Sequence, residues 1–337
     1  MPISNQTALA KVRTIYGKML KEEEYKNMLN CNTLKEVVDF LKNKDLYKHS
    51  FEILEKSNVE TNQIEKLIKN TTLLNYSRIH RLIKKNEVLK YFIKYYEIDE
   101  ILNITQLVEE KQVQQYMTHL PTYISLNCKV DLFSFSNVKN FEDLINILKN
   151  TKYGKMLSNF TEKKLDFLEL EHILYKNFFK ELLKTINSKT KNVELYELNR
   201  LIKTKIDNIN AYYIYRERVI FETEKEKIKN KIFPFHKNLN KEKIEKILDS
   251  QDTSQMEENF KSMYKKIDSF KIDTMEKNIK QQEFNLCKHY INLSTNITTV
   301  FYCYFILQQI EVENLIHILE GIRYNLEKEE IESFLIF

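Results

Sequence analysis

One short motif has the residue types and the spacing of a metal site. In Glu169-Leu-Glu-His172 a Glu and a His stand three residues apart, so a helix would place both side chains on one face. Di-iron helical bundles use this spacing, but they need a second copy of it and two further Glu residues. The sequence has no second copy. We therefore interpret the pair as part of a solvated helix face, and a helical metalloenzyme based on Glu169 and His172 is the weaker alternative.

Glycine is too rare for a nucleotide-binding loop. The 337 residues include only 3 Gly and 3 Pro. Rossmann and P-loop folds need glycine where the backbone meets a phosphate, and hairpins need Gly or Pro at their turns. Tyr-Gly-Lys-Met-Leu occurs twice, at 16–20 and 153–157, but no Gly stands five residues before either Gly-Lys pair. Nucleotide enzymes of these classes and all-β folds are excluded.

Cysteine and histidine form no recognisable site. The four cysteines are far apart in the sequence, at Cys31, Cys128, Cys287 and Cys303. We expect them to be small buried thiols in a reducing compartment. His289 and His317 stand among apolar and aromatic residues, where a packed or exposed neutral imidazole is expected. The sequence therefore predicts neither a bound metal nor a cofactor.

The charge pattern gives little support for nucleic-acid binding. Net charge is +5, and only seven of the 53 basic residues are Arg, the residue best suited to bidentate phosphate or base contacts. One helix is expected to carry a small basic face, formed by Arg78, Arg81, Lys84 and Lys85. This face is either simply solvated or contacts an acidic partner or anionic lipid headgroups.

Apolar residues recur at helical spacing almost throughout the chain. Leu34, Val37, Val38 and Leu41 follow the i, i+3, i+4, i+7 pattern of a helix with one buried face, after a Thr33-x-x-Glu36 capping box. The pattern recurs twice. One repeat has Phe141, Leu144, Ile145 and Leu148 after Asn140 and Asp143, and the other has Met256, Asn259, Phe260 and Met263 after Ser254-x-x-Glu257. The sequence thus predicts an all-α protein.

A second repeated feature is a four-residue landmark of apolar, acidic, polar and apolar residues. It reads Ile98-Asp-Glu-Ile101, Ile206-Asp-Asn-Ile209 and Val312-Glu-Asn-Leu315, with intervals of 108 and 106 residues. Matching intervals in two patterns predict three tandem helical modules, at 1–107, 108–219 and 220–337. The structural repeat positions are Asp99, Asp207, Asn208, Glu313, Asn314 and Gly321. Of these, Asp207-Asn208 and Glu313-Asn314 are expected to fix helix ends or to make polar contacts between modules.

At this point the sequence resembles the C subunit of bacterial and archaeal V-type ATPases, which is related to the eukaryotic V-ATPase d subunit. The resemblance is carried by Ala8-Leu-Ala-Lys-Val-Arg13, by Thr33-Leu-Lys-Glu-Val-Val-Asp-Phe-Leu41, and by Glu313-Asn-Leu-Ile-His-Ile-Leu-Glu-Gly321. Family members often end the repeated helix with a Thr-Asp-Tyr-Gly-like sequence. Here the corresponding sequences are Asn43-Lys-Asp-Leu-Tyr47 and Asn150-Thr-Lys-Tyr-Gly154.

The resemblance implies a fold and a role. The fold would be three pseudo-symmetric helical subdomains that form a funnel with a central socket. The role would be that of a non-catalytic rotor part of a V-type ATPase or ATP synthase. Such a part links the membrane c-ring to a shaft made of the D and F subunits during proton or sodium transport. A helical protein-binding scaffold unrelated to rotary ATPases is the alternative function.

The sequence predicts a cytoplasmic protein that reaches the membrane only through its complex. The N-terminal residues lack the basic and apolar regions of a signal peptide. The most apolar segment, 300–307, is far shorter than the ~20 residues that span a bilayer. We expect this segment to be a buried central helix, and the alternative is a surface strip that packs on the c-ring.

Overall fold

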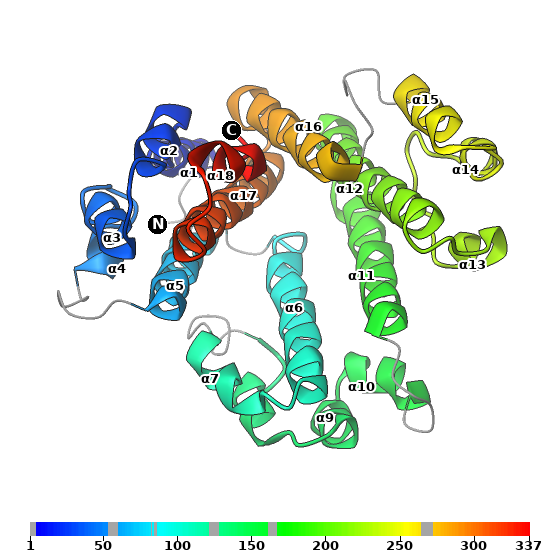
Figure 1. Ribbon diagram of the computed structural model, residues 1–337, viewed down its shortest axis with the longest axis horizontal. Helices are drawn as coiled ribbons and strands as arrows, with labels where there is room; N and C mark the ends of the chain where they lie inside the picture. The colour runs from blue at the N-terminus through cyan, green and yellow to red at the C-terminus, as the bar shows by residue number, and fades with distance from the viewer. Residues whose placement is uncertain are drawn as a thin grey trace. The chain divides into compact units, whose positions relative to one another are not determined.

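The computed structural model describes residues 5–52, 60–81, 83, 86–120, 128–160, 167–263 and 272–337. Within these ranges every regular element is an α-helix or a short 3₁₀ helix, which confirms the all-α prediction (Figure 1). The chain divides into two compact units. Unit 1 comprises residues 1–182 and 311–332, and unit 2 comprises 183–310 and 333–337. The helices α11 (Phe167–Lys189) and α17 (Ile297–Arg323) each contribute residues to both units.

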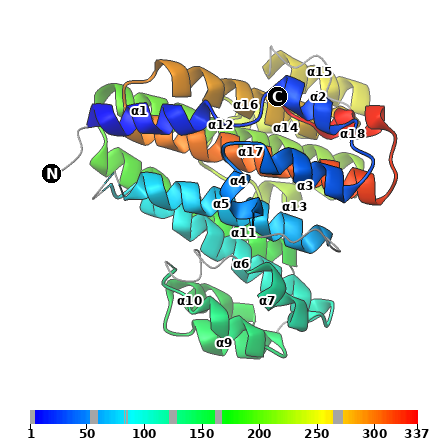
Figure 2. The same ribbon diagram turned by 90° about the vertical axis from the view of Figure 1, so that its left-hand side faces the viewer.

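Unit 1 contains short helices near the N-terminus and two long helices. Its elements before α11 are α1 (Asn5–Tyr16), α2 (Glu22–Met28), α3 (Leu34–Lys42), α4 (Lys48–Phe51), α5 (Thr61–His80), α6 (Lys90–Glu109), η1 (Val113–Gln115), α7 (Tyr116–His119), η2 (Leu132–Asn137), α9 (Phe141–Leu148), α10 (Lys152–Leu157) and η3 (Ser158–Phe160). The C-terminal part of α17 and helix α18 (Lys328–Phe334) lie beside α2 in Figures 1 and 2. A hydrogen bond of 2.9 Å from Lys328 Nζ to Asn30 Oδ1 joins the two regions. Residues from both ends of the chain thus build one unit.

Unit 2 is organised around α12 (Asn192–Val219) and α16 (Ile272–Leu293), which lie side by side (Figure 1). The two helices are antiparallel, because Glu197 near the start of α12 accepts a hydrogen bond from Ser294, just after α16, and Lys205 pairs with Glu283 farther along. The other elements of this unit are α13 (Lys225–Asn230), α14 (Lys241–Leu248) and α15 (Thr253–Met263). They bury one apolar cluster against α12, which includes Tyr215, Ile228, Ile247, Phe260 and Met275.

The predicted apolar stripes form the buried faces of α3, α9 and α15. Val37, Leu41, Leu144, Leu148 and Phe260 all have an exposed fraction of 0%. The segment 300–307 lies within α17, and each of its residues is buried, which confirms the buried-helix interpretation of this segment. Leu132 and Phe135 lie in the 3₁₀ helix η2, and both side chains are buried.

Two of the three predicted N-caps are correct and the third is displaced. Thr33 accepts from the Glu36 backbone N–H, and Asn140 accepts from that of Asp143. In α15 the cap is Asp252, which accepts from the Gln255 N–H at 2.8 Å, while the Gln255 side chain accepts from Gln251 N–H. The predicted Ser254-x-x-Glu257 cap is therefore wrong. Asp and Ser are equally good N-cap residues, and Asp252 comes two residues before Ser254, so α15 begins after Asp252.

The two copies of Tyr-Gly-Lys-Met-Leu have different surroundings. Gly154 lies in the first turn of α10, where an added Cβ would stand 2.3 Å from the Leu148 carbonyl oxygen and 2.6 Å from Lys149 Cα. Gly17 follows α1, and the nearest atom to an added Cβ is the Arg13 carbonyl oxygen at 3.4 Å. Only Gly154 is required by a close approach of two backbone segments.

We therefore predict that Gly154→Ala destabilises the protein and that Gly17→Ala does not. The first change should lower the free energy of unfolding by roughly 1–3 kcal/mol or more, because backbone atoms must move apart. The second should leave it unchanged or raise it by up to about 1 kcal/mol, since alanine restricts the unfolded chain. Urea unfolding followed by circular dichroism measures both. Equal losses in the two variants would contradict the close-contact explanation.

Candidate functional site

The best-defined polar site in unit 1 is the carboxylate of Glu311 in α17. Its side chain is 2% exposed and accepts two hydrogen bonds from the N-terminal region. The Leu20 backbone N–H donates to Oε2 at 2.7 Å, and the Tyr47 hydroxyl donates to Oε1 at 2.6 Å. Leu20 precedes α2 and Tyr47 precedes α4. One carboxylate therefore holds both ends of the α2–α4 bundle against α17, more than 260 residues away in the sequence.

A second carboxylate in the same unit has the same arrangement. Glu97 in α6 is 3% exposed and accepts from the Lys129 backbone N–H at 2.7 Å and from the Tyr153 hydroxyl at 2.8 Å. Lys129 precedes η2, and Tyr153 lies in α10, after the repeated helix α9. The donors are thus of the same kinds and in equivalent places as those of Glu311. The arrangement ties the η2–α10 bundle to α6.

In unit 2 the contact is made by a different residue of the long helix. Asp207 in α12 is 2% exposed and accepts from the backbone N–H groups of Lys237 at 3.0 Å and Asn238 at 2.6 Å. Asn210, one turn later, exchanges two hydrogen bonds of 2.9 Å with the backbone of Phe233. Lys205, which occupies the position of Glu97 and Glu311 in the repeat, pairs instead with Glu283 at 3.2 Å. The hydrogen bonds that Asp207 and Asn210 make to the segment before α14 therefore all go to backbone groups.

Burial shifts the titration of two of these carboxylates. It raises the pKa of Glu311 from its ordinary 4.5 to about 7, a shift that the bonds from Tyr47 and Leu20 oppose and that the nearby charge of Glu24 increases. Burial likewise raises the pKa of Asp207, although the N–H groups of Asn238 and Lys237 favour the charged form. Burial of a charged carboxylate costs free energy, and hydrogen bonds from N–H and O–H donors offset this cost. The stability of the site therefore depends strongly on these donors.

Asp207, Asn208, Glu313 and Asn314 lie inside α12 and α17, so they do not form the ends of these helices. Their expected role in polar contacts between modules stays a prediction. Asp99 accepts from the Tyr175 hydroxyl at 2.6 Å, and Asn314 is buried and hydrogen-bonded to the Tyr25 hydroxyl. Asn208 is 2% exposed, and in the described part of the chain neither of its side-chain polar atoms has a hydrogen-bond partner. Glu313 is half-buried.

Gly321 marks a close contact between helices. An added Cβ would stand 2.5 Å from Ile331 Cγ1 of α18, so only glycine lets α18 pack this closely on α17. The contact lies within unit 1, beside the α2–α4 bundle that Glu311 holds.

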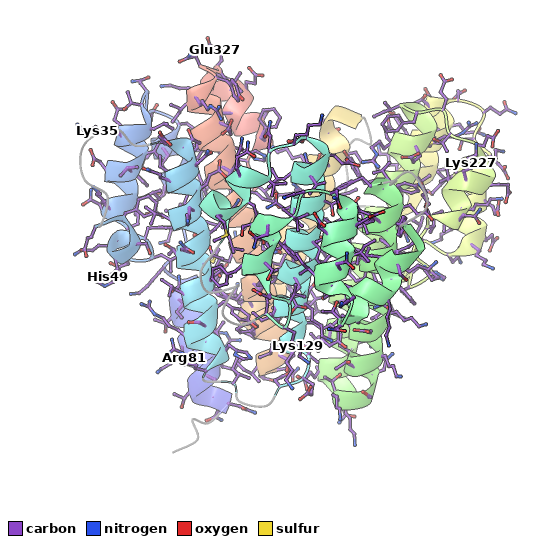
Figure 3. The ribbon with its side chains drawn as sticks, turned by 90° about the horizontal axis from the view of Figure 1, so that it is seen from below. Lys35, His49, Arg81, Lys129, Lys227 and Glu327 are labelled. Carbon is purple, nitrogen blue, oxygen red and sulfur yellow. The ribbon has the colours of Figure 1, made fainter. Side chains whose placement is uncertain are left out.

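The predicted basic face is described only in part. Arg78 is exposed near the end of α5, and Arg81 follows that helix (Figure 3). Arg78 hydrogen-bonds Asn75, and Arg81 bonds the Ser77 carbonyl and hydroxyl oxygens at 3.3 Å. Lys84 and Lys85 lie outside the described residues. In Figure 3, Arg81 and Glu327 lie at opposite ends of unit 1.

The motif residues considered for catalysis are not brought together. Glu169 and His172 share α11, and across the described ranges no group of three or more His, Cys, Asp or Glu side chains could hold a metal ion. His289 is exposed and His317 is half-buried. The four cysteines are free thiols, and Cys287 and Cys303 are buried as predicted. The prediction is wrong for Cys31 and Cys128, which are only half-buried. Over the same ranges, no helix combines the length and the apolar character that a membrane span requires.

Fold and site together define an all-helical protein whose buried acidic side chains hold short helical bundles against long helices. The sequence model of the ATP synthase (C/AC39) subunit family matches residues 8–334. The chain therefore belongs to this family, and the family resemblance is confirmed.

Three relatives support this assignment, and each is named as the C subunit of an A-type ATP synthase. The protein from Thermococcus kodakarensis is 23% identical over 67% of this chain and 60% of its own length. That from Pyrococcus furiosus is 23% identical over 62% of this chain and 55% of its own length. The protein from Pyrococcus horikoshii is 22% identical over 97% of this chain and 88% of its own length. The first two alignments thus span less than two thirds of the relatives.

Sequence reasoning missed Glu97 and Glu311. Both stand one residue before a landmark, and an acidic residue at that position in two of three repeats was the available signal. The third repeat has Lys205 there, which hid the pattern. The tyrosines that donate to them, Tyr47 and Tyr153, lie within the sequences already compared with the family's Thr-Asp-Tyr-Gly-like segment.

The titration of Glu311 gives a testable pH dependence. Because its folded-state pKa is raised, the folded protein binds the proton more tightly than the unfolded chain. The stability contributed by protonation is fully present below about pH 4.5 and is lost as pH rises to about 7. At about 1.4 kcal/mol for each pKa unit, the loss is on the order of 3 kcal/mol. The free energy of unfolding of the native chain minus that of Glu311→Gln should fall by this amount between these pH values.

A second variant checks the cause. Tyr47→Phe removes the hydrogen bond that favours the charged form, so the loss of stability should extend to higher pH. The groups that titrate or carry charge around Glu311 are Glu24, Tyr25 and Tyr47, and burial raises the pKa of Tyr25 well above its ordinary value. A difference between native protein and Glu311→Gln that does not change with pH would refute the assignment.

Proposed function

We propose that the chain is a non-catalytic central-stalk subunit of a V/A-type ATPase. In this role it links the membrane c-ring to the D–F shaft, transmits torque during proton or sodium transport, and lies at the cytoplasmic face of the membrane as part of the complex. The observation that carries the proposal is the family match over residues 8–334, which includes all three landmarks. The repeated buried carboxylates support it, because a part that transmits torque has to keep its bundles fixed to its long helices.

We also propose that the modules 1–107, 108–219 and 220–337 surround a socket that receives the shaft. Support comes from a third repeated feature, the way the landmark helices end. Lys111, Glu222 and Asn325 follow α6, α12 and α17, and all three have positive φ angles, of 58°, 49° and 54°. A residue in this left-handed conformation is a common helix terminator. A terminator of this kind follows each of the three helices that contain a landmark, as expected if one unit has been triplicated.

The partner test is size-exclusion chromatography with light scattering. The chain is run alone and mixed with the D–F pair of the same organism. We expect a monomer alone and a 1:1:1 complex in the mixture. If no complex forms at micromolar concentration, even with membranes that contain the c-ring, the rotor role is rejected and the protein-binding scaffold becomes the better hypothesis.

Arg78 and Arg81 are proposed to face an acidic partner, and the same assay tests them. Arg78→Gln/Arg81→Gln should weaken attachment to the shaft pair or to ring-containing membranes. Lys35→Gln/Lys48→Gln removes the same charge from exposed positions on α3 and α4, and it should have no effect (Figure 3 shows Lys35). If the two double variants weaken attachment equally, the effect comes from the net charge of the protein, and a specific contact of Arg78 and Arg81 is rejected.

A further inference from the structure

One end of unit 2 exposes apolar side chains that a folded protein normally covers. Val193 and Tyr196, in the first turns of α12, are 61% and 64% exposed, and Leu293, the last residue of α16, is 67% exposed. Val193 and Tyr196 are three residues apart and share a helix face. We call these three residues, with Lys189 at the end of α11 and Lys191 just before α12, the basic–apolar end.

Hydrogen bonds between α12 and the end of α16 hold the basic–apolar end together as one surface. The Arg200 guanidinium, one turn after Tyr196, donates to the Tyr290 hydroxyl at 3.2 Å, and Tyr290 lies one turn before Leu293. Glu197 accepts from Ser294 Oγ and from Asn296 Nδ2, both at 2.7 Å. These bonds fix the start of α12 to the loop after α16, so Tyr196 and Leu293 lie at the same end of the helix pair.

The charge of this end is positive. Lys189, Lys191 and Lys288 are exposed, and Arg200 is half-buried. Neither Lys189 nor Lys191 takes part in an ion pair with another described residue. Two acidic residues lie near these basic groups. Glu194 is half-buried, and Glu197 is 7% exposed and accepts hydrogen bonds from Ser294 and Asn296. Basic groups therefore outnumber the surface carboxylates here.

We propose that the basic–apolar end of unit 2 lies on the headgroup region of an anionic lipid bilayer. Apolar side chains that enter the interface and lysines that attract anionic lipids act together in such contacts, and neither is sufficient alone. Tyrosine is typical of this depth, because its ring is apolar and its hydroxyl is polar. Lysine is depleted in protein–protein interfaces, so a lysine-flanked apolar surface fits lipid better than protein. The proposal rests on the proposed rotor role in one respect: that role places the protein next to a membrane.

The opposite end of α12 provides a matched control. Ile220 and Phe221 are 52% and 59% exposed, so they offer comparable apolar surface. They are followed by the exposed carboxylates of Glu222 and Glu224, which an anionic membrane would repel. Substitution of these residues changes the total exposed apolar surface without touching the basic–apolar end.

The test is flotation of the full chain with vesicles of phosphatidylcholine alone or with phosphatidylglycerol as a minor component. We expect binding only to the anionic vesicles, and weaker binding at high salt. Lys189→Gln/Lys191→Gln should lower the partition coefficient roughly fivefold for each lysine. Tyr196→Ser/Leu293→Ser should abolish flotation. Ile220→Ser/Phe221→Ser, and Lys227→Gln/Lys241→Gln as the charge-matched pair, should bind like the native chain (Figure 3 shows Lys227).

Three results would overturn the lipid contact. These are no preference for anionic vesicles, equal losses in the control variants, and binding only to vesicles that contain the c-ring proteins. Formation of the complex with the D–F pair, measured on the same variants, separates this proposal from the rotor role. If flotation is lost and the complex still forms, the rotor role stands. If flotation is retained and no complex forms, even with membranes that contain the c-ring, the rotor role is rejected and the lipid contact stands.

Discussion

A carboxylate removed from water has to receive hydrogen bonds from its surroundings, and this requirement governs how the short bundles meet the long helices. Glu311 and Glu97 each receive one backbone N–H and one tyrosine hydroxyl, and Asp207 receives two backbone N–H groups. The backbone donors lie just before a bundle begins, where N–H groups are not used within a helix. Removal of any of these carboxylates would leave buried donors unsatisfied, which is why the contact is specific as well as stabilising.

The same requirement explains why unit 1 needs both ends of the chain. Helices α6 and α12 hold bundles that follow them in sequence, whereas α17 holds the α2–α4 bundle, which comes first. The last long helix thus packs against the first bundle, and residues 311–332 belong to unit 1. Gly321 supports the packing within unit 1, because it lets Ile331 of α18 approach α17 closely.

Local patterns were predicted well from the sequence, and long-range partners were not. The stripes of α3 and α9 and their caps at Thr33 and Asn140 depend on residues within one helical turn, so spacing alone reveals them. The cap of α15 was misplaced because Asp252 and Ser254 are both acceptable caps two residues apart. The landmarks were found, but the residue before each landmark makes the contact in unit 1. The donors lie 32 and 56 residues from Glu97 and 264 and 291 residues from Glu311, so they leave no local signal.

Hydrogen–deuterium exchange of individual segments tests the central claim most directly. If buried carboxylates hold the bundles, Glu311→Ala will speed amide exchange in residues 20–51 and leave 237–248 unchanged. Asp207→Ala will do the reverse, because its donors are the N–H groups of Lys237 and Asn238. Faster exchange throughout the chain in both variants, or none in either, would contradict the account and assign the packing of the bundles to apolar contacts alone.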